Sequence, residues 1–92
     1  MAHTTQDKDR LLKRVRRLRG QVEAIERALE EERECSDLLL LIAAARGATN
    51  GLMAEVVEGH VRHHIIDPDK KPRSPQSEAA QELIDVLRTY LR

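Results

Sequence analysis

The chain has 92 residues with one cysteine, one tyrosine and neither tryptophan nor phenylalanine, so its core must be aliphatic. A domain this small buries little surface by itself, and we expect it to gain stability by association. One cysteine excludes an intrachain disulfide and indicates a free thiol in a reducing cytoplasm. We find no signal peptide and no apolar run long enough to cross a bilayer, so no membrane attachment is expected.

The formal net charge of zero conceals two neighbouring segments of opposite charge. Residues 8–19 contain seven basic side chains and one acid, whereas residues 23–37 contain seven acids and two basic side chains. This separation produces a directional electrostatic field along the chain.

A first helix is predicted over about residues 6–32. Its apolar side chains recur at alternating steps of four and three residues, which is the spacing of one buried stripe on a helix. The stripe comprises Leu11, Val15, Leu18, Val22, Ile25 and Leu29.

The same helix carries basic side chains at positions i, i+3, i+4 and i+7, so we expect one exposed basic face opposite the apolar stripe. Such a face suits phosphate contacts with double-stranded DNA, although a solvated basic face is also common on a single helix. The chain lacks the aromatic side chains that stack on single-stranded bases, and it has no recognisable helix-turn-helix. The basic residues are Arg10, Lys13, Arg14 and Arg17.

A second helix is predicted over residues 35–64, after a short turn between residues 30 and 37 that contains neither glycine nor proline. Its apolar side chains cover more than one face, which indicates burial both against the first helix and against a partner chain. A short turn makes the two helices an antiparallel hairpin, in which residue n lies opposite roughly residue 65 − n.

A loop is predicted over residues 67–73, which contain two prolines and several charges. Ser74 followed by Pro75 has the form of a helix N-cap with proline in the first helical position, and a third helix then continues to the C-terminus. The expected fold is therefore all-α, with a long antiparallel hairpin and a short C-terminal helix in a single domain over residues 1–92.

Cys35 begins the second helix, and three histidines, His60, His63 and His64, lie at its end. At 1.5 Å per residue Cys35 and His60 are roughly 37 Å apart, so they cannot bind one metal ion within one chain. If two copies of this helix pack antiparallel, the cysteine of one copy lies beside the histidines of the other, and two identical sites form.

The middle of this helix offers a place for two copies to approach. Ala43, Gly47 and Gly51 recur every four residues, and small residues at that spacing allow close backbone contact. A kink at the glycines is the alternative interpretation.

The hairpin register places His3 near position 62, beside His60 and His64, which themselves lie one helical turn apart on the same face. Solvated surface histidines are the alternative interpretation of this pair. We predict a metal site made of His3, His60 and His64 from one subunit and Cys35 from its partner, with His63 in reserve.

Three imidazoles and one thiolate suit borderline divalent ions, and affinity for such a site rises through Co²⁺ and Ni²⁺ to Cu²⁺. An N-terminal amine on Ala2, exposed by removal of Met1, would raise the coordination number and favour Ni²⁺ or Co²⁺ over tetrahedral Zn²⁺, which is a further candidate. Cu(I) would need a second sulfur, and the sequence has none near His64.

Three segments together resemble the all-helical CsoR/RcnR/FrmR repressors over nearly the whole chain: RVRRLRGQVEAIERAL, the dipeptide EC, and LLLLIAAARGATNGLMAEVVEGHVRHHI. The resemblance implies a three-helix protomer, a dimer of dimers, and a repressor without a helix-turn-helix that leaves DNA when its inducer binds. It carries the DNA-contacting positions of the family to Arg14, Arg17 and Arg46.

The identities of four positions divide this family into branches. His3, Cys35, His60 and His64 are similar to the set of the nickel- and cobalt-responsive branch, although a third helix-end histidine of some members falls at Asp67 here. Copper-responsive relatives carry a second cysteine at the position of His64.

Formaldehyde-responsive relatives carry glutamate at the position of His64 and pair the thiol with an N-terminal proline amine. Ala2 and His64 both differ from that pattern.

We therefore expect a metal-free homotetramer that binds operator DNA, represses metal-efflux genes and is released by Ni²⁺ or Co²⁺. The nearest alternative is a formaldehyde sensor, in which a methylene bridge joins the Cys35 thiolate to the Ala2 amine.

Two further alternatives belong to other classes. A small helical enzyme would need charges on its apolar faces, but Arg14, Arg17 and Glu23 fall outside the apolar stripe, so we do not expect an enzyme. A cytosolic metal buffer leaves the basic face unexplained.

Overall fold

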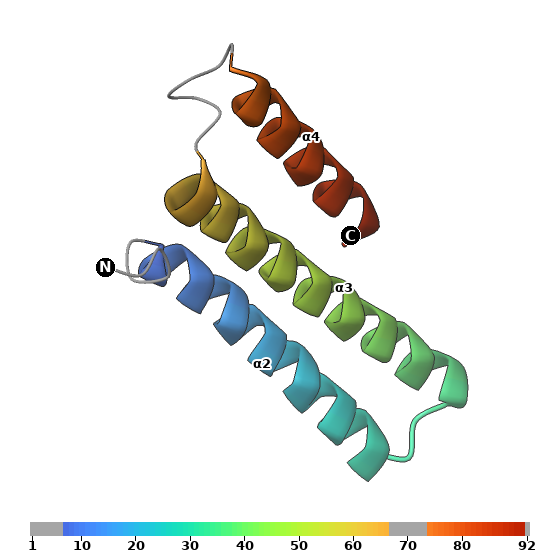
Figure 1. The fold of residues 1–92 in the computed structure, drawn as a ribbon. Helices are drawn as coiled ribbons and strands as arrows, with labels where there is room; N and C mark the ends of the chain where they lie inside the picture. Colours follow the sequence, from blue (N-terminus) through green and yellow to red (C-terminus); the bar gives the residue numbers. More distant parts are fainter. Residues whose placement is uncertain (1–6, 67–73, 92) are drawn as a thin grey trace.

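The computed structural model describes residues 7–66 and 74–91. It contains three α-helices, α2 (Lys8–Glu30), α3 (Cys35–His60) and α4 (Pro75–Tyr90), and a π-helical turn, η1 (Val61–Ile65), directly after α3. Helices α2 and α3 run antiparallel, and α4 lies beside the C-terminal half of α3 on the side away from α2 (Figure 1). The all-α, three-helix protomer predicted from the sequence is confirmed.

The predicted hairpin register is also confirmed. Arg10 forms an ion pair with Glu55, and the Arg14 guanidinium lies directly over Gly51, so that the paired residue numbers sum to 65. A Cβ atom on Gly51 would come within 2.9 Å of Arg14 Nη1, which shows how closely this side chain lies on α3.

The turn between α2 and α3 closes with the two hydrogen bonds of a Schellman motif. The Arg33 N–H donates to the Ala28 carbonyl at 3.0 Å, and the Glu32 N–H donates to the Leu29 carbonyl at 3.2 Å. This geometry places Glu32 at φ 53°, in the left-handed region that glycine usually occupies. The turn can be short although it contains no glycine, because Glu32 adopts the strained left-handed conformation.

Replacing Glu32 by glycine is therefore expected to stabilise the protein by about 1 kcal/mol, since the left-handed conformation penalises a residue with a Cβ atom. Thermal melting followed by circular dichroism at fixed protein concentration measures the effect. Glu31→Gly is the matched control, because Glu31 has φ −82° and glycine there only adds flexibility to the unfolded chain. A Glu32→Gly variant that melts no higher than the wild type would contradict this explanation of the turn.

The start of α4 has the predicted cap. Ser74 is the N-cap, its hydroxyl oxygen accepts the Ser77 N–H at 3.1 Å, and Pro75 occupies the first helical position. Helix α4 then buries Ile84 fully, together with Ala80, against Val61 of the π-helical turn.

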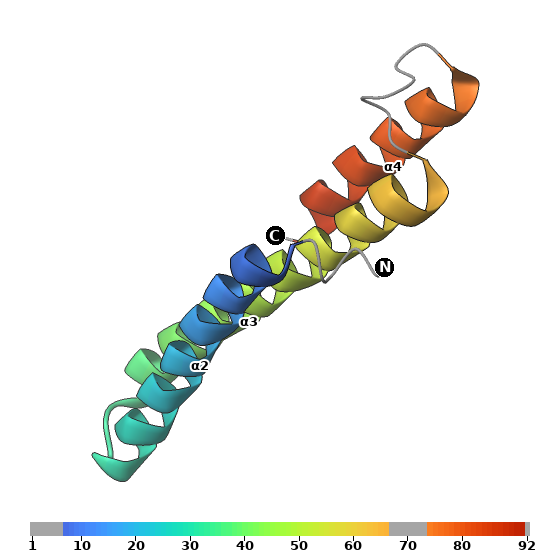
Figure 2. The same ribbon diagram turned by 90° about the vertical axis from the view of Figure 1, so that its left-hand side faces the viewer.

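The three helices form one flat layer rather than a closed bundle. The molecule measures 55 × 25 × 12 Å, and Figure 2 shows the layer edge-on. Its radius of gyration is 17.0 Å, whereas a compact chain of this length has roughly 12 Å. Since a stable domain usually needs at least two packed layers, both faces of this layer are available to other copies or ligands.

The predicted apolar stripe of the first helix is only half used within the chain. Leu11, Leu18 and Ile25 are partly buried, whereas the side chains between them remain exposed in the single chain. Exposed fractions are 42% for Val15, 52% for Val22 and 59% for Leu29. Contacts within one chain therefore bury only half of the predicted stripe, and the exposed half remains for contacts with other chains.

The expectation that no apolar segment could cross a bilayer also needs correction. Within the described residues, the helical segment Cys35–Ile65 has the necessary length and composition, with a mean hydropathy of 1.2, and none of its most apolar window is buried inside the chain. Length and composition alone are weak evidence for a membrane span, because a helix covered by other subunits has the same properties.

Candidate functional site

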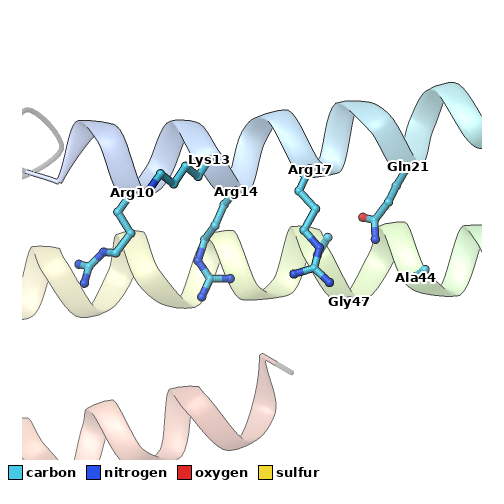
Figure 3. A pocket seen from close by; sticks show the side chains of 8 residues that line it. Arg10, Lys13, Arg14, Arg17, Gln21, Ala44 and Gly47 are labelled. Atoms are coloured by element: carbon cyan, nitrogen blue, oxygen red, sulfur yellow. The ribbon is translucent and has the colours of Figure 1, made fainter.

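The basic residues of α2 line a groove along α3, which we call the basic groove (Figure 3). Its volume is about 590 Å³, and small α3 residues form the opposite wall, leaving room for the long side chains. The four basic residues are exposed, as the sequence predicted, and they also border the contact with α3. The lining residues are Arg10, Lys13, Arg14, Arg17, Gln21, Ala44, Gly47 and Ala48.

Two of the four basic side chains are paired with carboxylates of the same chain. Arg14 Nη2 lies 3.2 Å from Glu55 Oε1, and Arg10 Nη2 lies 3.4 Å from both Glu55 Oε2 and Asp7 Oδ1. Lys13 and Arg17 form no ion pair with any other residue in the described part of the chain. The groove therefore combines unpaired cations with cations that already hold a carboxylate, a difference that the sequence did not indicate.

Arg46, the fifth predicted DNA-binding residue, is exposed on α3 but does not line the basic groove. The structure brings four of the five predicted residues together and leaves Arg46 apart from them within one chain.

The histidine end of α3 departs from a regular α-helix. The α-helix ends at His60, and the Ile66 N–H donates to the Val61 carbonyl at 2.8 Å, a bond across five residues that closes the π-helical turn. The His60 and His64 rings remain adjacent, with centroids 5.1 Å apart and planes tilted by 35°. Two imidazoles at this separation can both direct a nitrogen at one metal ion, because metal–nitrogen bonds are about 2.1 Å long.

His63 lies apart from this pair and faces the start of α2. Its Nε2 atom is 4.0 Å from Asp7 Oδ2, close enough for an ion pair when the imidazole is protonated. The structure therefore assigns His63 a neighbour on α2 rather than a position beside the other two rings.

Cys35 is exposed at the first residue of α3, at the end opposite the histidines. No cluster of three potential metal ligands forms within residues 7–66 and 74–91. The remaining predicted ligands, Ala2 and His3, lie outside the described residues. Asp67, which stands where some nickel- and cobalt-responsive members carry a third histidine, also lies outside them.

Although distant, Cys35 and the histidine pair share one side of α3. Eighteen residues make five turns of an α-helix, so Met53 lies in line with Cys35 and His60 lies in line with Ile42. Cys35 and Ile42 are seven residues apart, which is about two turns, so they also lie in line with each other. The thiol and the His60–His64 pair therefore lie at the two ends of one exposed, largely apolar stripe, with Ile42 and Met53 about half exposed between them.

The basic groove lies on the other face of the layer. Ala44, which lines the groove, follows Ile42 by two residues, and two residues turn an α-helix by roughly half a revolution. In the same way Val15 precedes Arg17 by two residues on α2. One face of the layer therefore carries the basic groove. The other carries the thiol, the histidine pair and the exposed apolar side chains of α3, together with Arg46, which lies about three turns from Cys35.

The small residues of α3 acquire a different neighbour from the one that the sequence predicted. Gly47 lines the basic groove and Gly51 lies beneath Arg14, so both face side chains of α2. The expected close approach between two copies of α3 is therefore not needed to explain Gly51. A Cβ atom on Gly47 would meet nothing within 4 Å, so no contact among the described residues explains that glycine.

A second group of ion pairs joins α3 to α4. Glu58 accepts the Arg62 Nε–H at 3.2 Å and also pairs with Arg88 of α4. These residues surround a small cavity of about 200 Å³ beside Asp7 and His63. The i,i+4 spacing of Glu58 and Arg62 is visible in the sequence, whereas their link to Arg88 is not, since Arg88 is 30 residues from Glu58 and lies on another helix.

The described residues form a flat, all-helical layer with a basic groove on one face and an exposed thiol and a histidine pair on the other. The chain belongs to the metal-sensitive transcriptional repressor family, whose sequence model matches residues 7–89.

Relatives of known sequence match over the full length of both chains. The chain is 53% identical to an uncharacterised protein encoded in the bioA 5′ region of Serratia marcescens, and 40% identical to the transcriptional repressor RcnR of Salmonella paratyphi B.

A solved structure is similar as well. The formaldehyde-responsive regulator FrmR of Salmonella enterica serovar Typhimurium, as a variant with histidine in place of a glutamate, is 45% identical with a TM-score of 0.64. The match covers 95% of this chain and 96% of that one.

Proposed function

We propose that this member of the family is a cytoplasmic repressor that responds to Ni²⁺ or Co²⁺ and controls genes for metal efflux. The observation that carries the proposal is the His60–His64 pair, with ring centroids 5.1 Å apart, on the same stripe of α3 as the exposed Cys35. Two imidazoles and a thiolate favour late first-row divalent ions.

The site requires a second copy of the chain. Cys35 lies more than 30 Å from His60 along α3 by the helix rise of 1.5 Å per residue, so the thiol cannot join the histidines of its own chain. An antiparallel copy of α3 packed on the apolar face places Cys35 of one subunit beside His60 and His64 of the other, twice about one axis. Such packing would also cover the exposed Met53 and Val22.

In this assembly the inducer site is completed by His3 from the N-terminal segment, with the Ala2 amine as an additional ligand and His63 as a neighbour. We propose a homotetramer built as a dimer of dimers, because two flat layers joined by their apolar faces still expose helix edges and α4 side chains such as Tyr90, 80% exposed.

The charged face remains open for double-stranded operator DNA. Arg10, Lys13, Arg14 and Arg17 would contact phosphates through the basic groove, and repetition across the tetramer would multiply the number of phosphates neutralised. Arg46 would join them from the tetramer rather than from the same chain, since it lies outside the groove.

The release mechanism follows from the position of the site. Ligation of His3, His60 and His64 would fix the N-terminal segment against the end of α3, next to Asp7, which pairs with Arg10 of the groove. Restraining the start of α2 in this way would move its basic side chains relative to the DNA phosphates that they contact. A coupling of about 1–3 kcal/mol would weaken DNA binding roughly five- to 150-fold.

Formaldehyde sensing is the second candidate, favoured by the exposed thiol of Cys35 and by the similarity to FrmR. Sequence identity does not separate the two, because RcnR at 40% and FrmR at 45% are about equally similar. His64 supports the metal response, since it stands where the family resemblance places glutamate in formaldehyde-responsive relatives.

Fluorescence anisotropy of the reduced protein on DNA from its own upstream region tests the proposal. Titrations are made alone and with Ni²⁺, Co²⁺, Zn²⁺, Cu(I) or formaldehyde. Release by Ni²⁺ or Co²⁺ supports the proposed site, whereas release by formaldehyde alone moves the function to aldehyde sensing. Absence of salt-sensitive binding in every condition would refute DNA repression through the basic groove.

A further inference from the structure

A carboxylate lies beside the basic groove and pairs with two of the arginines that line it. Glu55 of α3 is only 23% exposed, and each of its two carboxylate oxygens faces a different arginine of α2. The distances are 3.2 Å from Oε1 to Arg14 and 3.4 Å from Oε2 to Arg10. Glu55 therefore partly neutralises two of the four cations that line the groove.

The α3 surface is shaped to keep one of these arginines in place. Gly51 precedes Glu55 by one helical turn, and the Arg14 guanidinium lies over it where a Cβ atom would leave only 2.9 Å. Arg14 therefore lies flat along α3 with its Nη2 atom directed at Glu55, while its side chain remains 43% exposed to solvent.

We infer that Glu55 is an internal competitor of DNA phosphate that lowers the affinity of the repressor for DNA. A carboxylate and a phosphate both offer arginine two oxygens at similar spacing, so the same guanidinium groups cannot satisfy both fully. When DNA enters the groove, Arg10 and Arg14 exchange Glu55 for phosphates, and Glu55 is left near the negative backbone. This inference rests on the proposed DNA-binding function of the basic groove.

One physical consequence is that DNA binding by the wild type should depend less on salt than DNA binding by a variant without the Glu55 carboxylate. Each phosphate that an arginine neutralises releases counterions from DNA. A Glu55 carboxylate that loses its arginine attracts cations from solution, which offsets part of that release. Removing the carboxylate should therefore both tighten DNA binding and steepen its salt dependence.

The test compares Glu55→Gln with Glu58→Gln by anisotropy on upstream DNA over a range of salt concentrations. Glu58 lies one turn further along α3 and pairs with Arg62 and Arg88, so its variant has the same charge change but leaves Arg10 and Arg14 paired. We expect Glu55→Gln to bind DNA at least about fivefold more tightly than the wild type, with a steeper salt slope. Glu58→Gln should stay within about twofold.

A third variant separates charge from shape. Glu55→Asp retains the negative charge and should remain closer to the wild type than Glu55→Gln does, with circular dichroism confirming that every variant is folded. Equal or weaker DNA binding by Glu55→Gln would overturn the inference, since it would mean that Glu55 orients the arginines for DNA. A wild type without salt-sensitive DNA binding would instead overturn the proposed function itself.

Discussion

Replacing Cys35 by alanine is expected to abolish the response to Ni²⁺ while leaving the affinity of the metal-free protein for DNA within about twofold of the wild type. The thiol is exposed at the start of α3 and does not line the basic groove, so its loss removes a metal ligand without changing the DNA surface. Anisotropy titrations with and without Ni²⁺ should show the roughly five- to 150-fold weakening of DNA binding reduced to no measurable change.

Ser36→Ala is the matched control, because Ser36 is the exposed neighbour of Cys35 and offers no thiolate. His64→Ala distinguishes the two candidate inducers, since it removes a metal ligand but none of the groups needed for a methylene bridge. Full release of Cys35→Ala by Ni²⁺ would contradict the proposed site. A His64→Ala variant that responds to formaldehyde as the wild type does would favour aldehyde sensing.

The double substitution of Arg14 and Arg17 by glutamine is expected to weaken DNA binding by at least about 100-fold, because the loss is repeated in every subunit that touches DNA. The salt slope should become shallower by about one for each phosphate contact removed. Both effects should be similar on operator and unrelated DNA, since phosphate contacts do not depend on base sequence.

Arg19→Gln provides the control for that experiment. Arg19 is exposed on the same helix but does not line the basic groove, so its variant removes one positive charge, half of the loss in the double variant, in a different place. If Arg19→Gln reduced DNA binding as much as the substitutions at Arg14 and Arg17, general basicity rather than the groove would explain binding.

Much of the fold could be predicted because local patterns determine it. The alternating apolar spacing predicted the first long helix, and the Ser74–Pro75 pair predicted the start of α4. The short turn predicted the hairpin register that the Arg10–Glu55 pair confirms. The left-handed Glu32 could not be predicted, because no glycine marks the position and its conformation is imposed by the geometry of the turn.

The site was predictable in composition but not in arrangement. Periodicity grouped the arginines of α2, yet it could not show that Arg10 and Arg14 fold back onto Glu55, because that pairing depends on side-chain contacts between helices. The π-helical turn after His60 was also missed, since a regular helix and a π-helical turn both keep His60 and His64 adjacent.

The half-used apolar stripe and the flat layer have a common explanation. Val15, Val22 and Leu29 are spaced for burial, but within one chain they have no surface to pack against. In the assembly that we propose, these side chains would contact another chain. A pattern in one chain can indicate such a contact without specifying its geometry. The apolar surface of α3 is also exposed in the single chain, and another copy would cover it in the assembly that we propose.

The most direct test of a site shared between two chains is complementation between inactive variants. Cys35→Ala and His64→Ala are purified separately and as a co-expressed mixture that contains both chains, and Ni²⁺ binding is measured in competition with a chelating dye. In a mixed dimer one site loses both ligands and the other keeps both, so each mixed dimer should bind one ion tightly. Because random pairing makes about half of the dimers mixed, we predict about one tightly bound ion for four chains. A mixture that binds Ni²⁺ no better than either variant alone would contradict the shared site.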